Sequence, residues 1–369
     1  MPIRQNTWNL SGHYDLTNSG QNAYVGNSIL FSWGYNTYGQ LGQNNTTYRS
    51  SPVQIPGTTW NIISAGSRHS LATKTDGTLW SWGYNNRGQL GQSNIIPYSS
   101  PIQIPGTTWS SIGGGANVSL ATKTDGTLWA WGFNSGGQLG QNNTTYRSSP
   151  VQIPGTTWNK VFVGGVSAFA TKTDGTLWSW GYNTFGQLGQ NNLTQYSSPV
   201  QIPGTTWNSV RTGFNHSLAI KTDGTLWSWG YNTNGQLGQN NRTSYSSPVQ
   251  IPGTAWNSIS SGTQHLLATK TDRTLWSWGR NQYGQLGQNN TTNYSSPVQV
   301  PGTTWSSISN AYHSLATKTD GTLWSWGYNS GGELAQSNRT FYSSPIQIPG
   351  TTWSSISAGY RHSLATQNI

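Results

Sequence analysis

Five histidines recur at one position of a repeated sequence, where a set of imidazole groups could bind a metal ion. They are His69, His216, His265, His313 and His362. Two further copies of the repeat carry Val118 and Ser167 there, and equivalent atoms on separate structural units should lie too far apart for one coordination sphere. We therefore interpret the five histidines as structural, hydrogen-bonded to a neighbouring turn, and expect no metal site.

The carboxylates give equally little reason to expect catalysis. Six aspartates stand in a recurring Lys-Thr-Asp-Gly-Thr sequence, or its close variant, where a turn explains them. Acid–base chemistry would need groups that occur once, and the non-periodic ones are His13, Asp15 and Glu333. The chain has no cysteine, which excludes disulfides, thiolate zinc sites and a cysteine nucleophile. We predict no catalytic residues and no cofactor.

The periodic histidines and aspartates belong to a sequence repeat, and each copy of the repeat contains a Trp-Gly pair. The pair begins at Trp33 and returns six times, at intervals of 49 residues except for a last interval of 48; the later copies begin at Trp82, Trp131, Trp180, Trp229, Trp278 and Trp326. A fixed period of this size is typical of stacked supersecondary units that bury their apolar faces against one another. The chain therefore carries seven copies of one unit.

Residues 69–83, HSLATKTDGTLWSWG, show how one unit should fold. Asp76-Gly77 between two runs of strand-forming residues predicts a hairpin with a type I′ turn. Counting outward from that turn places Leu71 opposite Trp82 and Ala72 opposite Ser81. One face of the hairpin is then bulky and the other is small.

Such an asymmetric sheet can stack its tryptophan face on the shallow serine and alanine face of the next unit. The rest of each unit adds a glycine-rich turn, a short strand that ends at Pro56 and a link that carries Trp60. Four short strands per unit, repeated radially, predict a propeller with no helix of any length.

The two ends of the chain complete one unit between them. Residues 29–34 lack a preceding HSLAT strand, and the last such strand, residues 362–366, has no Trp-Gly strand after it. We expect these segments to pair antiparallel, with Leu364 opposite Trp33. The prediction is an all-β, seven-bladed β-propeller at residues 29–369, closed by a shared N-/C-terminal blade, after an N-terminal arm at residues 1–28.

The sequence WGYN..GQLGQ after HSLATKTDGTLWSWG resembles the repeat of the regulator of chromosome condensation family, over residues 29–366. The resemblance implies a seven-bladed propeller. The founder of that family exchanges nucleotide on a small GTPase through a protruding wedge and a basic tail, whereas this arm carries only Arg4 against Asp15. A secreted bacterial inhibitor of β-lactamases with this fold is a precedent for binding without chemistry.

Residues that vary inside the constant repeat point to a binding surface. They are rich in the residue types that favour interfaces, although drift in unconstrained loops would also produce variation. The predicted binding residues after WGYN are Tyr38, Arg87, Phe185, Asn234 and Tyr283; those before the histidine position are Arg68, Phe214, Tyr360 and Arg361.

The net charge of +10 suggests a mild preference for anionic partners. Six lysines and six aspartates cancel within the repeats, and the rest of the charge comes mainly from scattered arginines. A nucleic-acid binder usually shows a clustered basic stripe, so we consider nucleic acid an unlikely partner. No segment has the apolar length of a membrane helix or of a secretory signal core, so we expect no membrane insertion.

These observations predict a non-catalytic propeller whose loops bind a macromolecule, either a protein or a surface glycan. The composition, poor in charge and rich in Asn, Thr, Ser and Gly, favours a virion or cell-surface recognition or structural component. An intracellular, cytoplasmic adaptor, a regulator resembling a guanine-nucleotide-exchange factor, and a protein inhibitor of another enzyme are the alternatives.

Overall fold

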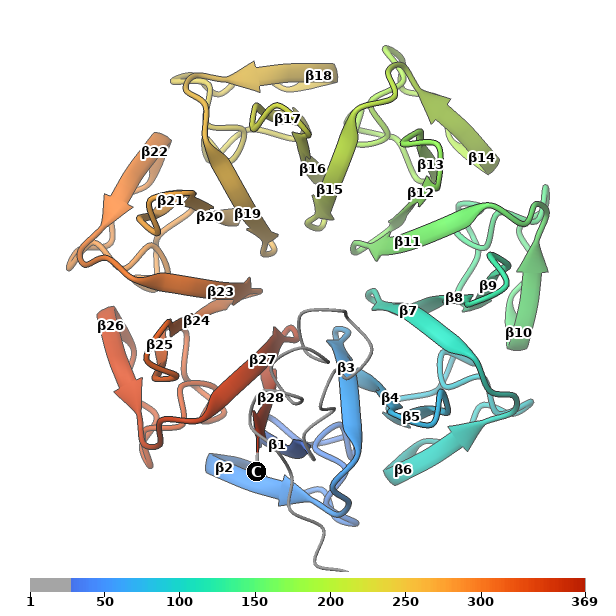
Figure 1. Ribbon diagram of the computed structural model, residues 1–369, viewed down its shortest axis with the longest axis horizontal. Coiled ribbons are helices and arrows are strands. Elements are labelled where there is room, and N and C mark those ends of the chain that lie inside the picture. The colour runs from blue at the N-terminus through green and yellow to red at the C-terminus, as the bar shows by residue number, and fades with distance from the viewer. Residues whose placement is uncertain (1–27, 369) are drawn as a thin grey trace, which may run out of the picture.

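A computed structural model describes residues 28–368 and contains seven four-stranded antiparallel sheets around a central axis (Figure 1). This confirms the all-β, seven-bladed propeller, and the described residues form no helix. The predicted arm, residues 1–28, lies outside the described residues except for Ser28, which begins the first strand. The division into arm and propeller therefore stays a prediction.

Six blades each use four consecutive strands, and the seventh, the closing blade, uses strands from both ends of the chain. The closing blade contains β27 (Trp353–Ala358), β28 (His362–Asn368), β1 (Ser28–Gly34) and β2 (Arg49–Ile55). Blade 1 contains β3 (Trp60–Ala65), β4 (His69–Lys74), β5 (Leu79–Gly83) and β6 (Tyr98–Ile104). Blade 2 contains β7 (Trp109–Gly114), β8 (Val118–Lys123), β9 (Leu128–Gly132) and β10 (Arg147–Ile153). Blade 3 contains β11 (Trp158–Val163), β12 (Ser167–Lys172), β13 (Leu177–Gly181) and β14 (Tyr196–Ile202). Blade 4 contains β15 (Trp207–Thr212), β16 (His216–Lys221), β17 (Leu226–Gly230) and β18 (Tyr245–Ile251). Blade 5 contains β19 (Trp256–Ser261), β20 (His265–Lys270), β21 (Leu275–Gly279) and β22 (Tyr294–Val300). Blade 6 contains β23 (Trp305–Asn310), β24 (His313–Lys318), β25 (Leu323–Gly327) and β26 (Tyr342–Ile348).

The hairpin turns differ from the predicted type I′ geometry. In blade 1 Gly77 has a positive φ of 76°, whereas Asp76 does not. The Gly77 amide donates to the Lys74 carbonyl at 3.0 Å, and the Lys74 amide donates to the Thr78 carbonyl at 3.0 Å. This is a three-residue loop, a type I turn followed by a left-handed glycine bulge.

The extra loop residue shifts the pairing register by one. Leu71 lies opposite Ser81 and Ala72 opposite Trp80, so the predicted pairing of Leu71 with Trp82 is wrong. Because side chains alternate between faces, a one-residue slip moves each side chain of one strand to the other face. Each tryptophan therefore faces a small residue, and the leucines occupy the opposite side of the blade.

Blade stacking follows from this register and differs from the prediction. The tryptophan face of one blade packs on the leucine and isoleucine face of the preceding blade, not on a serine and alanine face. Trp82 of blade 1, for example, packs with Leu30 and Leu364 of the closing blade. Its indole Nε1 also donates to the Gln40 carbonyl at 2.9 Å, which satisfies a buried donor across the seam.

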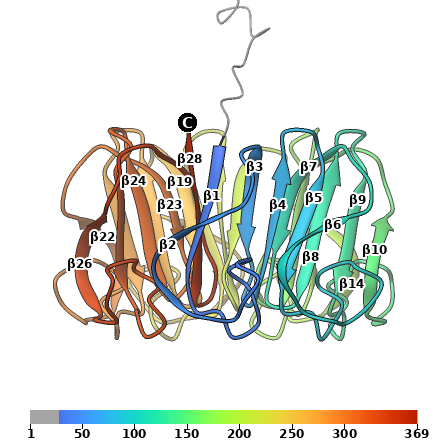
Figure 2. The same ribbon diagram turned by 90° about the horizontal axis from the view of Figure 1, so that it is seen from below.

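The closing blade confirms the predicted antiparallel pairing of the two chain ends. β1 and β28 lie side by side in both views (Figures 1 and 2). Leu364 lies opposite Ser32 and Trp33 opposite Ser363, one residue from the predicted register. The closing blade has no connecting turn here, yet it keeps the register of the other blades, where Leu71 lies opposite Ser81.

Trp60 and its equivalents begin the innermost strand of each blade, so the prediction that Trp60 lies in a link is wrong. The seven innermost strands surround a central channel with a volume of about 640 Å³. Trp60 is buried beside Trp80 and Trp82, with ring centroids 6.3 and 6.0 Å away. The Lys74 ammonium lies 4.3 Å from the Trp80 ring centroid, a cation–π contact that recurs in the other five hairpins.

Candidate binding surface

Two kinds of loop meet at one end of the propeller, here named the loop face. In blade 1 these are the β3–β4 loop and the long β5–β6 loop. The β4–β5 hairpin lies at the opposite end, named the hairpin face, because successive strands are antiparallel. Figure 2 shows connections at both ends of the strands. All nine predicted binding residues belong to the loop face.

Constant residues of the repeat hold the long loops in place from below. In the closing blade the buried Asn36 accepts a hydrogen bond from the Leu41 amide at 2.9 Å through Oδ1. Its Nδ2 donates to the carbonyls of Asn45 and Thr47, both at 3.0 Å. One buried amide therefore fastens both sides of the loop, which leaves the variable residues free to differ.

A glycine of the same loop brings it against the next blade. Gly39 has a φ of 79°, and a Cβ atom there would lie 2.5 Å from Cα of Ser99. Any side chain would therefore clash with backbone as well as strain the local conformation. Both its positive φ and its close approach to the next blade therefore require glycine at this position.

The periodic histidines bond from one blade to the next. The His69 Nε2 lies 3.0 Å from the Ser119 Oγ, and the His362 Nε2 lies 2.9 Å from the Ser70 Oγ. Their partners are therefore serines of adjacent blades and not neighbouring turns. Burial lowers the histidine pKa to about 4 in His69 and about 3 in His362, so the rings are neutral at physiological pH. Residues 28–368 contain no group of three side chains positioned to hold a metal ion.

The nine predicted residues differ in exposure and in their neighbours. Arg87, Phe185, Phe214 and Arg68 are exposed, whereas Tyr38, Asn234, Tyr283, Tyr360 and Arg361 are half-buried. None is buried between blades. Phe185 packs on Tyr231 at 4.7 Å between ring centroids, and the Arg87 guanidinium lies 5.5 Å from the Tyr146 ring. These residues, with Asn234 and Phe214, are spread around the ring and are not brought together.

Three of the predicted residues join one continuous cluster that extends over blade 5, blade 6 and the closing blade. We name it the tyrosine belt. The Tyr283 ring lies 5.0 Å from Tyr328, and Tyr312 lies 4.2 Å from Tyr360. The Arg361 guanidinium bridges two rings, Tyr328 at 5.4 Å and Tyr35 at 5.9 Å. The belt comprises Tyr35, Tyr48, Tyr283, Tyr312, Tyr328, Phe341, Tyr360, Arg339 and Arg361.

A second, smaller cluster stands beside the belt. Tyr38 lies 4.4 Å from Tyr84, and the Arg68 guanidinium lies 5.3 Å from the Tyr38 ring. Both clusters alternate aromatic rings with guanidinium groups. Such surfaces offer large, rigid contact areas with fixed positive charge.

Sequence reasoning missed the tyrosine of the WGYN element and the outer part of the long loop. Tyr35 and Tyr328 belong to the constant WGYN element, and Tyr48, Phe341 and Arg339 lie just before the SSP sequence. A usable signal was nevertheless present. The single 48-residue interval arises because the β23–β24 loop is one residue shorter than its equivalents, directly before Tyr312 of the belt. The one change in repeat length therefore falls in a loop that carries a belt residue.

Charge is strongly segregated between the two faces. The hairpin face carries the paired lysines and aspartates, whereas the loop face carries eight arginines: Arg49, Arg68, Arg87, Arg147, Arg242, Arg280, Arg339 and Arg361. Among the described residues the acid on the loop face is Glu333, which is buried. Burial raises the pKa of Glu333 to about 7, and its Oε2 accepts a hydrogen bond from the Gly331 amide at 2.7 Å. The loop face is therefore cationic.

Between Ser28 and Asn368 no helix is long and apolar enough to cross a membrane.

Comparison with solved structures shows the same fold. Yeast RCC1 (Prp20) bound to Kap60 matches with a TM-score of 0.84 and 21% identity, over 93% of this chain and 89% of that one. Prp20p from Saccharomyces cerevisiae, described with its binding properties to Gsp1p and histones, matches with a TM-score of 0.84 and 21% identity, over 94% and 92%. Human WBSCR16 matches with a TM-score of 0.83 and 19% identity, over 92% and 99%. No curated protein matches the sequence.

The family comparison covers nearly all of the propeller. The description "RCC1-like domain" matches residues 29–365, from the first strand into the last. This agrees with the resemblance that the repeat sequence carries. The chain belongs to the family of RCC1-like domains.

Proposed function

We propose that this propeller is a non-catalytic binding module that holds an acidic protein surface on its loop face, with the tyrosine belt at the centre of the contact. The observation that carries the proposal is the belt itself. Seven aromatic and two arginine side chains form one continuous surface, and these residue types contribute most of the energy at protein interfaces.

The position of the belt supports binding more than stability. The tryptophans and leucines that stack the blades lie below it in separate clusters, whereas belt residues contact one another above the seams. The two arginines of the belt and the six other arginines of the loop face would steer an acidic partner toward this face.

We infer an adaptor, or a regulator resembling a nucleotide-exchange factor, in preference to a virion or cell-surface component. The yeast relative is described as binding proteins, among them Gsp1p and histones. The comparisons give no support to a virion, host-recognition or extracellular setting. A surface glycan as partner likewise rests on composition alone.

The experiment compares protein capture by three forms of the chain. The belt variant changes Tyr283, Arg339 and Phe341 to Ala, and the control variant changes Arg87, Phe185 and Arg242 to Ala in loops of the same face that lie outside the belt, on blades 1, 3 and 4. Each removed anchor at the centre of an interface should cost about 2 kcal/mol or more. Proteins retained by wild type and control but lost by the belt variant support the proposal.

Equal capture by the belt variant and wild type, with both variants folded, would refute the central place of the belt. Release of labelled GDP from any captured small GTPase then separates the two mechanisms. Accelerated release indicates an exchange-like regulator, whereas unchanged release indicates an adaptor.

A further inference from the structure

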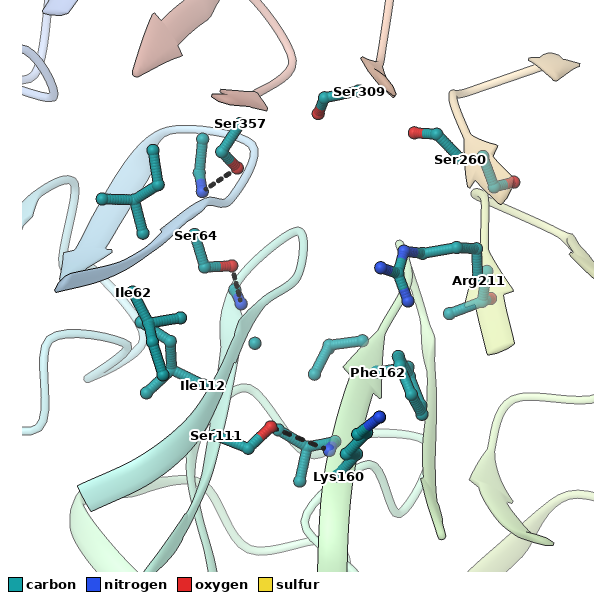
Figure 3. Close-up of a pocket in the computed structure, with 18 of the residues that line it drawn as sticks. Ile62, Ser64, Ser111, Ile112, Lys160, Phe162, Arg211, Ser260, Ser309 and Ser357 are labelled. Atoms are coloured by element: carbon teal, nitrogen blue, oxygen red, sulfur yellow. Dashed lines mark hydrogen bonds between the residues drawn. The ribbon is translucent and has the colours of Figure 1, made fainter. Parts of the chain in front are cut away.

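The wall of the central channel repeats one serine in most blades. At the fifth residue of the innermost strand stand Ser64, Ser260, Ser309 and Ser357. Each bonds to the next blade: the Ser64 Oγ, for instance, accepts from the Gly114 amide at 3.0 Å. Figure 3 shows these hydroxyl groups around the channel. This position serves to join blades, so departures from serine need another explanation.

The three departures are adjacent in space. Blades 2, 3 and 4 carry Gly113, Phe162 and Arg211 at this position, and Lys160 lies two residues before Phe162 on β11. Figure 3 shows Arg211, Phe162 and Lys160 on one side of the channel, across from Ser64 and Ser357. One sector of the channel is thus cationic and aromatic, while the remainder is neutral.

The Arg211 side chain is positioned by two contacts, and its positive charge remains accessible to a ligand in the channel. Its guanidinium lies 5.2 Å from the Phe162 ring centroid and donates from Nη1 to the Val210 carbonyl at 2.7 Å. Both Arg211 and Lys160 remain exposed within the channel. The lining residues include no carboxylate, so neither cation has a counter-charge there.

The shape of the channel limits what can reach these groups. At the loop face the channel is narrow, and the cavity there has a volume of about 100 Å³. Its lining includes the backbones of Gly66, Gly164 and Gly213. The wider part, about 640 Å³, reaches the starts of the inner strands at the hairpin face. Lys160 lies nearer that entrance and Arg211 deeper. The cavity has the volume of a typical small-molecule site.

We propose that the channel binds a small polyanion, carrying phosphate or carboxylate groups, between Arg211 and Lys160. A guanidinium recognises either group through two parallel hydrogen bonds, and an ammonium adds a second positive charge. The serine hydroxyl groups of the other blades that line the channel can donate to the remaining oxygens. This site is separate from the loop face, so its failure and that of the proposed function are independent.

The repeat supplies substitutions that the fold already accepts. Arg211→Ser restores the residue of four other blades, and Lys160→Ser restores that of Ser111 and Ser209. Arg242→Ser removes one charge from the loop face and is the control. Titration calorimetry with pyrophosphate and with citrate, in low salt, measures binding, and thermal unfolding checks that each variant is folded.

We expect saturable binding by the wild type, weakened roughly tenfold or more in Arg211→Ser, weakened less in Lys160→Ser and unchanged in Arg242→Ser. Binding of pyrophosphate alone identifies a phosphate ligand, and binding of citrate alone identifies a carboxylate ligand. The proposal is overturned if neither anion binds saturably, or if Arg211→Ser and Arg242→Ser behave alike.

Discussion

At the scale of single residues, the most unusual group is Glu333. Six repeats place a glutamine at its position, such as Gln236 and Gln40, and the seventh places a carboxyl group there, in the seam between blade 6 and the closing blade. Its side chain is buried, although Arg361 partly offsets the cost of ionising it. The residue thus makes stability at this seam depend on pH.

We predict that Glu333→Gln stabilises the propeller at pH 8 and hardly changes it at pH 5. The folded pKa of about 7 lies above the ordinary value of 4.5, so the folded chain binds more protons than the unfolded chain between these values. Wild-type stability therefore falls as pH rises from 4.5 through 7. The gain at pH 8 should be at most on the order of 3 kcal/mol, measured by chemical denaturation at both pH values.

The converse substitution, Gln236→Glu, should introduce the same pH dependence at another seam. An identical effect of Glu333→Gln at pH 5 and pH 8 would show that the carboxyl group does not titrate in this range.

At the scale of elements, the hairpin turns show what a one-residue difference does. Five of the six turns place glycine at the left-handed position, and the sixth places Arg273 there, with a φ of 64°. In the neighbouring link Thr304 also has a positive φ, 68°, a form shared by Thr108 and Ala255 beside the glycine turns of blades 1 and 4. In blade 2 the equivalent link residue, Thr157, has no positive φ, and a Cβ on Gly126 would lie 2.1 Å from the Thr156 carbonyl oxygen.

We expect Arg273→Gly to stabilise the protein by about 1 kcal/mol, because glycine adopts a positive φ without steric cost. Thermal unfolding of the purified variant measures the gain. Gly126→Arg is the contrast, and should destabilise the protein by clearly more than 1 kcal/mol, since the side chain would also meet the Thr156 carbonyl. A loss of stability in Arg273→Gly would mean that the arginine makes a favourable contact that outweighs its strain.

The existence of the elements could be predicted, but their register could not. The period, the Asp-Gly turns and the divided last blade follow from residue types and spacing. The register depends on whether the loop at Asp76 has two or three residues, and Asp-Gly suits both. A shift of one residue moves every side chain of a strand to its other face. The same error therefore placed Leu71 opposite Trp82 and predicted that the tryptophans pack on serine and alanine and not on leucine and isoleucine.

At the scale of the whole molecule, the ring depends on a single strand at its closure. β28 lies between β1 and β27, so it joins the two ends of the chain in one sheet. Trp33 of β1 packs against Leu315, Leu323 and Ile348 of blade 6, and this seam closes only when β1 is held in place.

Deleting the chain from Ser357 onward should abolish cooperative unfolding at the wild-type temperature. The deletion removes β28 and exposes both a strand edge and an aromatic face. Calorimetry measures the transition. The control is truncation after Thr366, which keeps residues Leu30 to Gly34 of β1 paired with β28. An unchanged transition in the longer deletion would count against ring closure.

The binding surface could be predicted in outline only. Variation between repeats pointed to loops that share one face, but it gave equal weight to nine residues spread around the ring. Contacts between side chains of different blades decide which of them form a continuous surface, and those depend on loop geometry. Tyr283, Tyr360 and Arg361 joined the belt, whereas Phe185 and Asn234 did not.

Hydrogen exchange of the full chain, with and without its captured protein partner, tests the central claim most directly. We predict slower exchange of backbone amides in the loops that carry the belt, residues 35–48, 280–293, 311–312, 328–341 and 360–361, with little change in the β4–β5 hairpin and its equivalents. Slower exchange confined to the hairpin face, residues 74–78 and their equivalents, would contradict the assignment of binding to the loop face.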